Sequence, residues 1–160
     1  MSRCAIYPGS FDPITYGHLD LIKRATVVFE DVIVGVAENT QKNTLFSIDE
    51  RVDMVKETTG DIGKVRVESF KGLVIDYARS KNVHILIRGV RMFSDFEYEL
   101  QMALTNRRLD ETIETVFLMP SEGHSFLSST LIKEGVLLGA DVSTFVPRSV
   151  AARLKEKLNK

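Results

Sequence analysis

The sequence has a single cysteine and no hydrophobic run near the roughly 20 residues that cross a bilayer. Cys4 cannot form an internal disulfide, and its apolar neighbours favour a buried, unreactive thiol. The first residues lead into a strand-like segment without the apolar core of a signal peptide. We therefore expect a cytoplasmic protein that has no membrane partner and no redox chemistry.

The sequence also lacks an excess of charge of either sign. Its 160 residues include 21 Lys+Arg and 22 Asp+Glu, which gives a formal net charge of −1. Because nucleic-acid binding normally requires a basic surface, no nucleic-acid partner is expected, and any anionic ligand must be bound by a local cluster. No long linker divides the chain, so we expect one domain over residues 1–160.

Several catalytic motifs are absent. The sequence contains no Gly-x-x-x-x-Gly-Lys-Ser/Thr loop, no Gly-x-Ser-x-Gly and no His/Cys spacing typical of zinc. These absences count against phosphate-loop kinases, serine hydrolases and zinc enzymes. No metal-ligating side chains are predicted.

Short apolar segments alternate with amphipathic ones, which is typical of a parallel sheet covered by helices. The predicted strands are residues 4–8, 32–36, 65–69, 83–88 and 115–119. The predicted helices are residues 18–29, 73–81, 94–109, 128–138 and 149–158, with one more starting near residue 47. The expected fold class is α/β: a single-domain, Rossmann-like, doubly wound sheet of five parallel strands with flanking helices.

Two helix starts carry the pattern of a capping box. Ser47 is followed by Glu50, and Ser94 by Glu97, so a hydroxyl and a carboxylate could satisfy the first helical amides reciprocally. In the segment 94–109, apolar residues that include Phe96 share one helical face. His84, in contrast, has no catalytic motif around it and is predicted to be an ordinary strand residue.

The first predicted strand runs into a turn rich in glycine and proline that delivers Gly17 and His18 to a helix start. Free amides and the helix dipole make such a start attractive to a phosphate, and glycine permits close approach to the backbone. Alternatively, Gly9 and Gly17 are only turn residues and His18 is a surface cap.

Two other segments suit an anion. Arg88 and Arg91 follow the fourth predicted strand, and arginine binds phosphate through a planar fork; a solvated loop is the alternative. After the fifth strand come three hydroxyls, Ser128, Ser129 and Thr130, which are either phosphate donors or N-caps. Ligands bind a doubly wound sheet where the strand order reverses, commonly beside the first and fourth strands, and this favours the phosphate interpretation for the segments after those two strands. For the three hydroxyls the two interpretations stay equally open.

Thr15-Tyr16-Gly17-His18 resembles the signature of the His/Thr-x-Gly-His nucleotidyltransferases. Essentially the whole chain is similar to one branch of them, the bacterial phosphopantetheine adenylyltransferases. The resemblance rests on the ordered motifs Tyr7-Pro8-Gly9-Ser10-Phe11-Asp12-Pro13, Arg88-Gly89-Val90-Arg91, Asp95-Phe96-Glu97-Tyr98-Glu99 and Ser125-Phe126-Leu127-Ser128-Ser129-Thr130 with Lys133-Glu134.

This resemblance implies an enzyme of coenzyme A biosynthesis that transfers AMP from ATP to 4'-phosphopantetheine, uses Mg²⁺ and forms a homohexamer. His18 would stabilise the transition state, and Ser10, Lys42 and Arg91 would assist catalysis. The acceptor would contact Ser10, Lys42, Val74 and Arg88. The ATP site would comprise Ser10, Phe11, His18, Gly89, Val90, Arg91, Glu99, His124, Ser125, Phe126, Leu127, Ser128, Ser129 and Thr130.

The sequence departs from the family pattern at two of these positions. Many relatives have threonine at position 10 and a large aromatic at position 124, where this chain has Ser10 and His124. Two alternatives to the implied activity stay open: a nicotinate or nicotinamide mononucleotide adenylyltransferase, and a regulator that binds adenine nucleotides without turnover.

Overall fold

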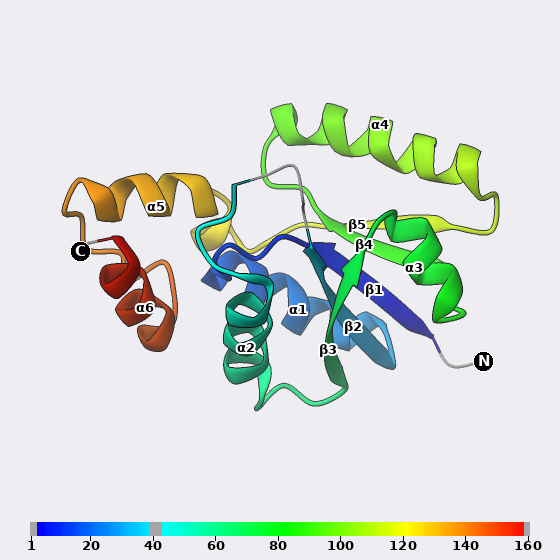
Figure 1. Cartoon of the computed structure of the whole chain (residues 1–160). Helices are drawn as coiled ribbons and strands as arrows, with labels where there is room; N and C mark the ends of the chain where they lie inside the picture. The colour runs from blue at the N-terminus through cyan, green and yellow to red at the C-terminus, as the bar shows by residue number, and fades with distance from the viewer. Residues whose placement is uncertain (1–2, 39–42, 159–160) are drawn as a thin grey trace.

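The computed structural model describes residues 3–38 and 43–158, and within them all strands join one sheet (Figure 1). The strands are β1 (Cys4–Gly9), β2 (Asp31–Glu38), β3 (Val65–Lys71), β4 (Ile85–Gly89) and β5 (Glu114–Leu118). Their order is β3-β2-β1-β4-β5, and every neighbouring pair is parallel. The predicted five-stranded parallel sheet is confirmed, with element ends shifted by up to a few residues.

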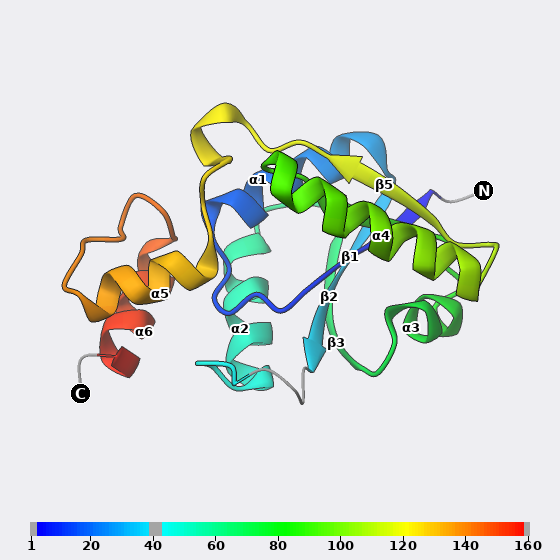
Figure 2. The same cartoon turned by 90° about the horizontal axis from the view of Figure 1, so that it is seen from above.

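The described residues form six α-helices and one short 3₁₀ turn, of which α1 to α4 connect the strands and the others follow β5. They are α1 (Tyr16–Val28), α2 (Ile48–Thr59), α3 (Val74–Ser80), α4 (Phe93–Leu109), η1 (Glu122–His124), α5 (Ser129–Leu137) and α6 (Arg148–Leu158). Helices α5 and α6 pack together on the side toward which the strands run, away from α3 and the N-terminus (Figure 2).

The apolar character of the central strands follows from their burial on both faces. Successive side chains of a strand alternate between faces. On β2, Val34 belongs to the apolar cluster that contains residues of α1 and α2, whereas Ile33 belongs to the cluster that contains residues of α3. Both side chains are almost completely buried. The sheet is therefore doubly wound, as the sequence predicts.

The reversal of strand order lies between β1 and β4. The chain builds β1, β2 and β3 outward in one direction and then returns, so that β4 pairs with the other edge of β1, where Ile6 lies opposite Leu86. Parallel strands end at the same edge, so the segments after β1 and β4 face one crevice. This confirms the predicted switch point.

Of the two predicted capping boxes, only the first is present. The Ser47 hydroxyl accepts a hydrogen bond from the Glu50 amide at 3.2 Å, and a Glu50 carboxylate oxygen accepts one from the Ser47 amide at 2.8 Å. The second prediction is wrong: α4 starts at Phe93, and its N-cap residue is Met92, which makes no side-chain cap bond. Ser94 lies inside the first turn, two positions after the N-cap residue.

The apolar face of α4 is present, but the sheet of this chain does not cover it. Phe96 is 43% exposed and Leu104 is 53% exposed. The rings of Phe96 on this face and Phe117 on β5 meet in an edge contact with a centroid distance of 5.9 Å. His84 also differs from expectation: it is exposed and precedes β4 rather than lying in it. Among the described residues, no helix is long and apolar enough to cross a membrane.

The packing of α1 predicts how its residues contribute to stability. Ile22 is fully buried, whereas Val27 on the same helix is 86% exposed. We expect Ile22→Ala to lower the free energy of unfolding by about 2–5 kcal/mol, because it removes buried methyl groups and leaves a cavity. The control Val27→Ala should change it by less than about 0.5 kcal/mol. Urea denaturation measures both, and equal effects of the two variants would contradict the placement of α1.

Candidate functional site

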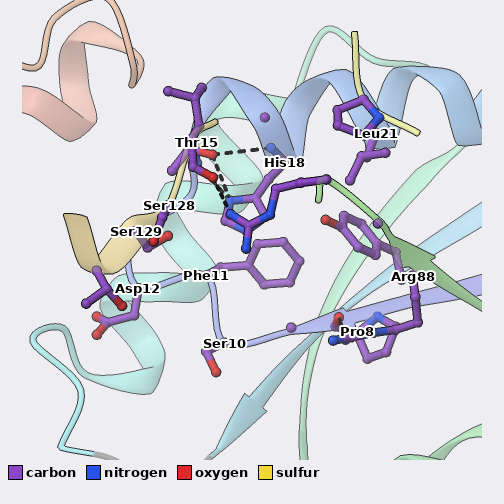
Figure 3. A pocket seen from close by; sticks show the side chains of 18 of the residues that line it. Pro8, Ser10, Phe11, Asp12, Thr15, His18, Leu21, Arg88, Ser128 and Ser129 are labelled. Atoms are coloured by element: carbon purple, nitrogen blue, oxygen red, sulfur yellow. Dashed lines mark hydrogen bonds between the residues drawn. The ribbon is translucent and has the colours of Figure 1, made fainter. Parts of the chain in front are cut away.

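A cavity of about 500 Å³ opens at the crevice between β1 and β4. Its lining comes from the segment after β1, the start of α1, the end of β4, α4 and the start of α5 (Figure 3). The three segments that the sequence singled out for anion binding therefore meet in one place. The site residues predicted from sequence that line the cavity are Ser10, Phe11, His18, Arg88, Gly89, Arg91, Glu99, Leu127, Ser128, Ser129 and Thr130.

The remaining predicted site residues are placed differently. Lys42 lies outside the described residues. Val74, Val90, His124, Ser125 and Phe126 do not line the cavity of this ligand-free structure. His124 Nδ1 lies 2.8 Å from the Ser121 hydroxyl, and its ring is 6.3 Å from that of Tyr16. The contacts expected of these residues stay predictions.

The orientation of His18 is fixed by the residue that begins its helix. The Thr15 amide donates a hydrogen bond to His18 Nδ1 at 3.0 Å, while the His18 amide donates to the Thr15 hydroxyl at 3.3 Å. This is a capping box in which histidine takes the usual place of glutamate (dashed lines in Figure 3). Because Nδ1 accepts a hydrogen bond from the Thr15 amide, this nitrogen carries no proton, and the neutral ring carries its proton on Nε2.

The surroundings of His18 also favour the neutral ring. Burial lowers the pKa of His18 from 6.5 to about 4, and the positive charges of Arg91 and Arg88 act in the same direction. The buried ring of Phe11 packs against the imidazole with a centroid distance of 5.0 Å. His18 therefore offers the cavity a neutral, oriented N–H donor rather than a positive charge.

The start of α1 differs from the expected array of free amides. The Tyr16 amide donates to the Phe145 carbonyl at 2.9 Å, and the His18 amide is bonded to Thr15. The expectation that these amides are free for a phosphate is wrong, because the protein satisfies them internally. The segment before α5 lies next to Gly17, where a Cβ would be in ordinary contact with the His124 carbonyl oxygen at 3.4 Å.

Arg88 is held in a fixed orientation. Its Nε and Nη2 donate to the two carboxylate oxygens of Glu99 at 2.7 and 2.6 Å, and its Nη1 donates to the Pro8 carbonyl at 3.0 Å. Although burial opposes the charged form, the contacts with Glu99 raise the pKa of Arg88. Resemblance assigned Arg88 to the acceptor and Glu99 to ATP, but here the two side chains form a direct bidentate pair.

Arg91 joins the segments after β4 and β5. It donates to the Leu127 carbonyl, and its Nε donates to Asp95 at 3.2 Å. Gly89 allows β4 to end against α1, since a Cβ there would lie 2.3 Å from a methyl carbon of Leu21. Close packing of these backbones therefore brings the arginine side chains to the cavity.

The hydroxyls at the start of α5 do not act as conventional caps. Ser128 is the N-cap residue but makes no side-chain cap bond, and the Ser129 hydroxyl donates to the Pro13 carbonyl at 2.8 Å. This arrangement counts against the alternative in which the hydroxyls serve only as N-caps. Ser129 instead ties α5 to the segment after β1.

Three charged residues at or beside the cavity received no role from the sequence. Asp12 and Arg51 are buried, and Lys133 forms an ion pair with Asp12 at 2.8 Å. Asp12 and Lys133 could have been identified from the sequence, because both lie within the motifs that carry the resemblance. Arg51 lies in a helix with an ordinary amphipathic pattern, and only the folded chain reveals its burial.

The described residues contain no group of three His, Cys, Asp or Glu side chains that could hold a metal ion. The carboxylates of Asp12 and Glu99 at the cavity already bind Lys133 and Arg88. A magnesium ion that arrives with a nucleotide needs few protein ligands, because Mg²⁺ retains waters and binds substrate phosphates. The cavity is therefore compatible with a metal carried by its substrate.

Comparison with known proteins places this site in a family context. The cytidylyltransferase-like family matches residues 6–135. The phosphopantetheine adenylyltransferase of Caldanaerobacter subterraneus is 52% identical over 158 residues, which cover 99% of each chain. The protein of the same name from Clostridium novyi is 51% identical over 158 residues, with 99% of this chain and 98% of that protein covered.

A solved structure shares the fold at much lower identity. The nicotinic acid mononucleotide adenylyltransferase of Plasmodium falciparum, complexed with NaAD, superposes with a TM-score of 0.74. The match covers 99% of this chain and 97% of that chain at 14% identity. At this identity the likeness establishes a common architecture only.

The environment of His18 predicts an unusual titration. Since the folded pKa of about 4 lies below the ordinary 6.5, the unfolded chain binds this proton at higher pH than the folded protein does. The contribution of neutral His18 to stability is present above pH 6.5 and is lost as pH falls toward 4. NMR titration of the ligand-free protein should give a His18 midpoint near 4, and a midpoint near 6.5 would contradict this account.

Proposed function

We propose that this chain, which belongs to the cytidylyltransferase-like family and within it to the phosphopantetheine adenylyltransferases, transfers AMP from ATP to 4'-phosphopantetheine. The products are dephospho-coenzyme A and pyrophosphate, and the reaction belongs to coenzyme A biosynthesis. The observation that carries the proposal is an identity of about half with such enzymes over almost the whole chain. The cavity at the switch point supports it, because segments suited to phosphate meet there.

The proposed reaction needs no general base. A phosphate monoester has a second pKa near 6, so the acceptor is already mostly dianionic near neutral pH. One of its oxygens attacks the α-phosphorus of ATP in line, the new P–O bond forms, and the bond to pyrophosphate breaks. The protein then has to position the two substrates and stabilise the negative charge that shifts among the phosphoryl oxygens.

His18 is proposed to stabilise the transition state. Its Nδ1 is occupied by the Thr15 amide, so Nε2–H is the donor available to a phosphoryl oxygen. A neutral imidazole can donate this hydrogen bond without first losing or gaining a proton, and the capping box fixes its orientation before substrate arrives. Ser10, Lys42 and Arg91 are proposed to assist it.

Arg88 is proposed to hold the acceptor phosphate together with Lys42, while Ser10 and Val74 contact the acceptor. Its bidentate contact with Glu99 holds the guanidinium in place, which lowers the conformational cost of binding an anion. The start of α5, with Ser128, Ser129 and Thr130, is proposed to hold the phosphates of ATP together with Gly89 to Arg91. Phe11, Glu99 and the segment from His124 to Leu127 would complete the nucleotide side.

Magnesium is proposed to accompany ATP and to neutralise charge on its phosphates. Because the cavity carboxylates are engaged by Lys133 and Arg88, the ion would bind mainly phosphates and water, near the hydroxyls at the start of α5. The protein groups that remain for positioning are the side chains described above.

The homohexamer is also proposed here, together with a cytoplasmic location. What supports self-association is the apolar face of α4, where Phe96, Leu100 and Leu104 are each more than a third exposed. Large exposed apolar patches on a protein commonly mark interfaces. The number of subunits rests on the resemblance alone.

The substrate assignment is tested by offering the protein ATP and magnesium with a panel of phosphorylated acceptors. We expect adenylylation of 4'-phosphopantetheine, with dephospho-coenzyme A identified by mass and pyrophosphate released in equal amount. Turnover of nicotinate or nicotinamide mononucleotide in place of phosphopantetheine would replace the assignment with the related transferase. ATP binding without any turnover would indicate a nucleotide-binding regulator instead.

His18→Ala tests the proposed catalytic role. A donor directed at charge that grows during reaction contributes more to the transition state than to bound substrate, so kcat should fall more than affinity. Loss of one comparable donor costs about 10²–10³ in turnover, and we expect an effect of that size or greater. The control is His84→Ala, at an exposed position outside the cavity, which should retain nearly normal kcat. If the kcat of a folded His18→Ala variant stayed within about threefold of the parent value, the role of His18 would be helix capping only.

A further inference from the structure

Asp12 connects two sides of the cavity through one buried carboxylate. Its Oδ1 accepts a hydrogen bond from the Phe46 amide and its Oδ2 accepts one from the Leu45 amide, both at 2.9 Å. Oδ2 also accepts a hydrogen bond from Lys133 Nζ on α5 at 2.8 Å. The side chain is only 8% exposed. Segments that are far apart in the sequence are therefore held by a single short side chain.

The three partners of Asp12 belong to two parts of the chain that line the cavity. Asn43 and Thr44, directly before Leu45, lie on its wall. Lys133 also lies on the wall, about one turn after Ser128 and Ser129 at the start of α5. In terms of the proposed function, the first segment belongs to the acceptor side and α5 to the nucleotide side.

A second buried charge, the guanidinium of Arg51, also binds the acceptor-side segment. Arg51 on α2 is 2% exposed, and its Nε donates to the Phe46 carbonyl at 3.2 Å. Its Nη1 donates to the carbonyls of Ser10 and Ala37 at 2.7 and 2.9 Å. Phe46 is thus fixed through its amide by Asp12 and through its carbonyl by Arg51. Among the described residues, Arg51 bonds to Phe46, Ser10 and Ala37, whereas Asp12 also bonds to Lys133 on α5.

We propose that Asp12 is a positioning residue that sets the separation between the acceptor and nucleotide sides of the cavity. A buried carboxylate is stable only while its donors remain in place, so its bonds resist displacement of either side. In-line attack requires the reacting atoms to lie about 3–3.5 Å apart, and a misplacement of about 1 Å can cost 10²-fold in rate. This inference rests on the proposed function, because that function defines the two sides.

Asp12→Asn tests the proposal with little change in size. The amide keeps one carbonyl oxygen but turns the other acceptor into a donor that faces an amide or ammonium group. We expect KM to rise about tenfold or more for both ATP and phosphopantetheine, together with a fall in kcat. Arg51→Lys alters the bonds to the segment of Phe46 but none to α5 among the described residues, so it should raise KM for phosphopantetheine more than KM for ATP.

The chain offers a matched control in Asp110→Asn. Asp110 accepts hydrogen bonds from the Thr112 amide at 3.0 Å, from the Thr112 hydroxyl at 2.7 Å and from Arg79 at 2.7 Å. It lies before β5, away from the cavity. The same chemical change at Asp110 should lower the free energy of unfolding, while both KM values and kcat stay within about threefold of the parent values.

Two kinetic results would overturn the proposal. In the first, kcat and both KM values of Asp12→Asn match those of Asp110→Asn. In the second, Asp12→Asn raises KM for one substrate only. If Asp12→Asn does not fold, Asp12→Glu keeps the charge and lengthens the side chain by one methylene; folded protein with both KM values unchanged would also refute it. Calorimetric measurement of ligand affinities separates a failure of this inference from a failure of the proposed function. If the parent makes no dephospho-coenzyme A, the proposed function is wrong. In that case, loss of affinity for both ligands in Asp12→Asn still supports the positioning role of Asp12, and unchanged affinities refute it.

Discussion

The pairing of β1 with β4 is the constraint on which the functional site depends. These strands are far apart in the sequence, yet Ile6 lies opposite Leu86. Because the pairing is parallel, both strands deliver their following segments to one edge of the sheet. α1 therefore begins beside the segment of Arg88 and Arg91, and α5 packs against the turn after β1 through the bond from Ser129 to Pro13. A different strand order would separate these segments even if each formed correctly.

Within that crevice the protein satisfies its own charges before any substrate binds. Arg88 pairs with Glu99, Arg91 with Asp95 and Lys133 with Asp12. Thr15 fixes the ring of His18 through the backbone. Groups that are already oriented need little reorganisation when charge develops during phosphoryl transfer, and this is the main contribution a protein can make to such a reaction. The cavity is thus built for positioning rather than for supplying an activated nucleophile.

The differences between the sequence predictions and the structure have local physical reasons. The strands and helices were predicted well because each segment adopts the secondary structure that its apolar periodicity indicates. The capping box at Ser94 failed because α4 begins at Phe93 with Met92 as its N-cap residue, so the motif lies two positions too late. The free amides expected at the start of α1 are bonded to Thr15 and to Phe145, a residue remote in sequence. The apolar face of α4 was identified correctly, but periodicity does not reveal that it remains exposed in this chain.

The sequence by itself determined the fold class, the switch point and most of the cavity wall, since these follow from local periodicity and from motifs placed after particular strands. Residues such as Ser10, His18 and Arg88 were found because their motifs are short and continuous. The tertiary structure alone decided which groups meet. The neutral state of His18, the pair of Arg88 with Glu99 and the bonds of Asp12 and Arg51 to Phe46 depend on burial and on contacts between distant segments. Such contacts have no local pattern, because packing of the whole chain sets both the distance between the partners and their exclusion from water.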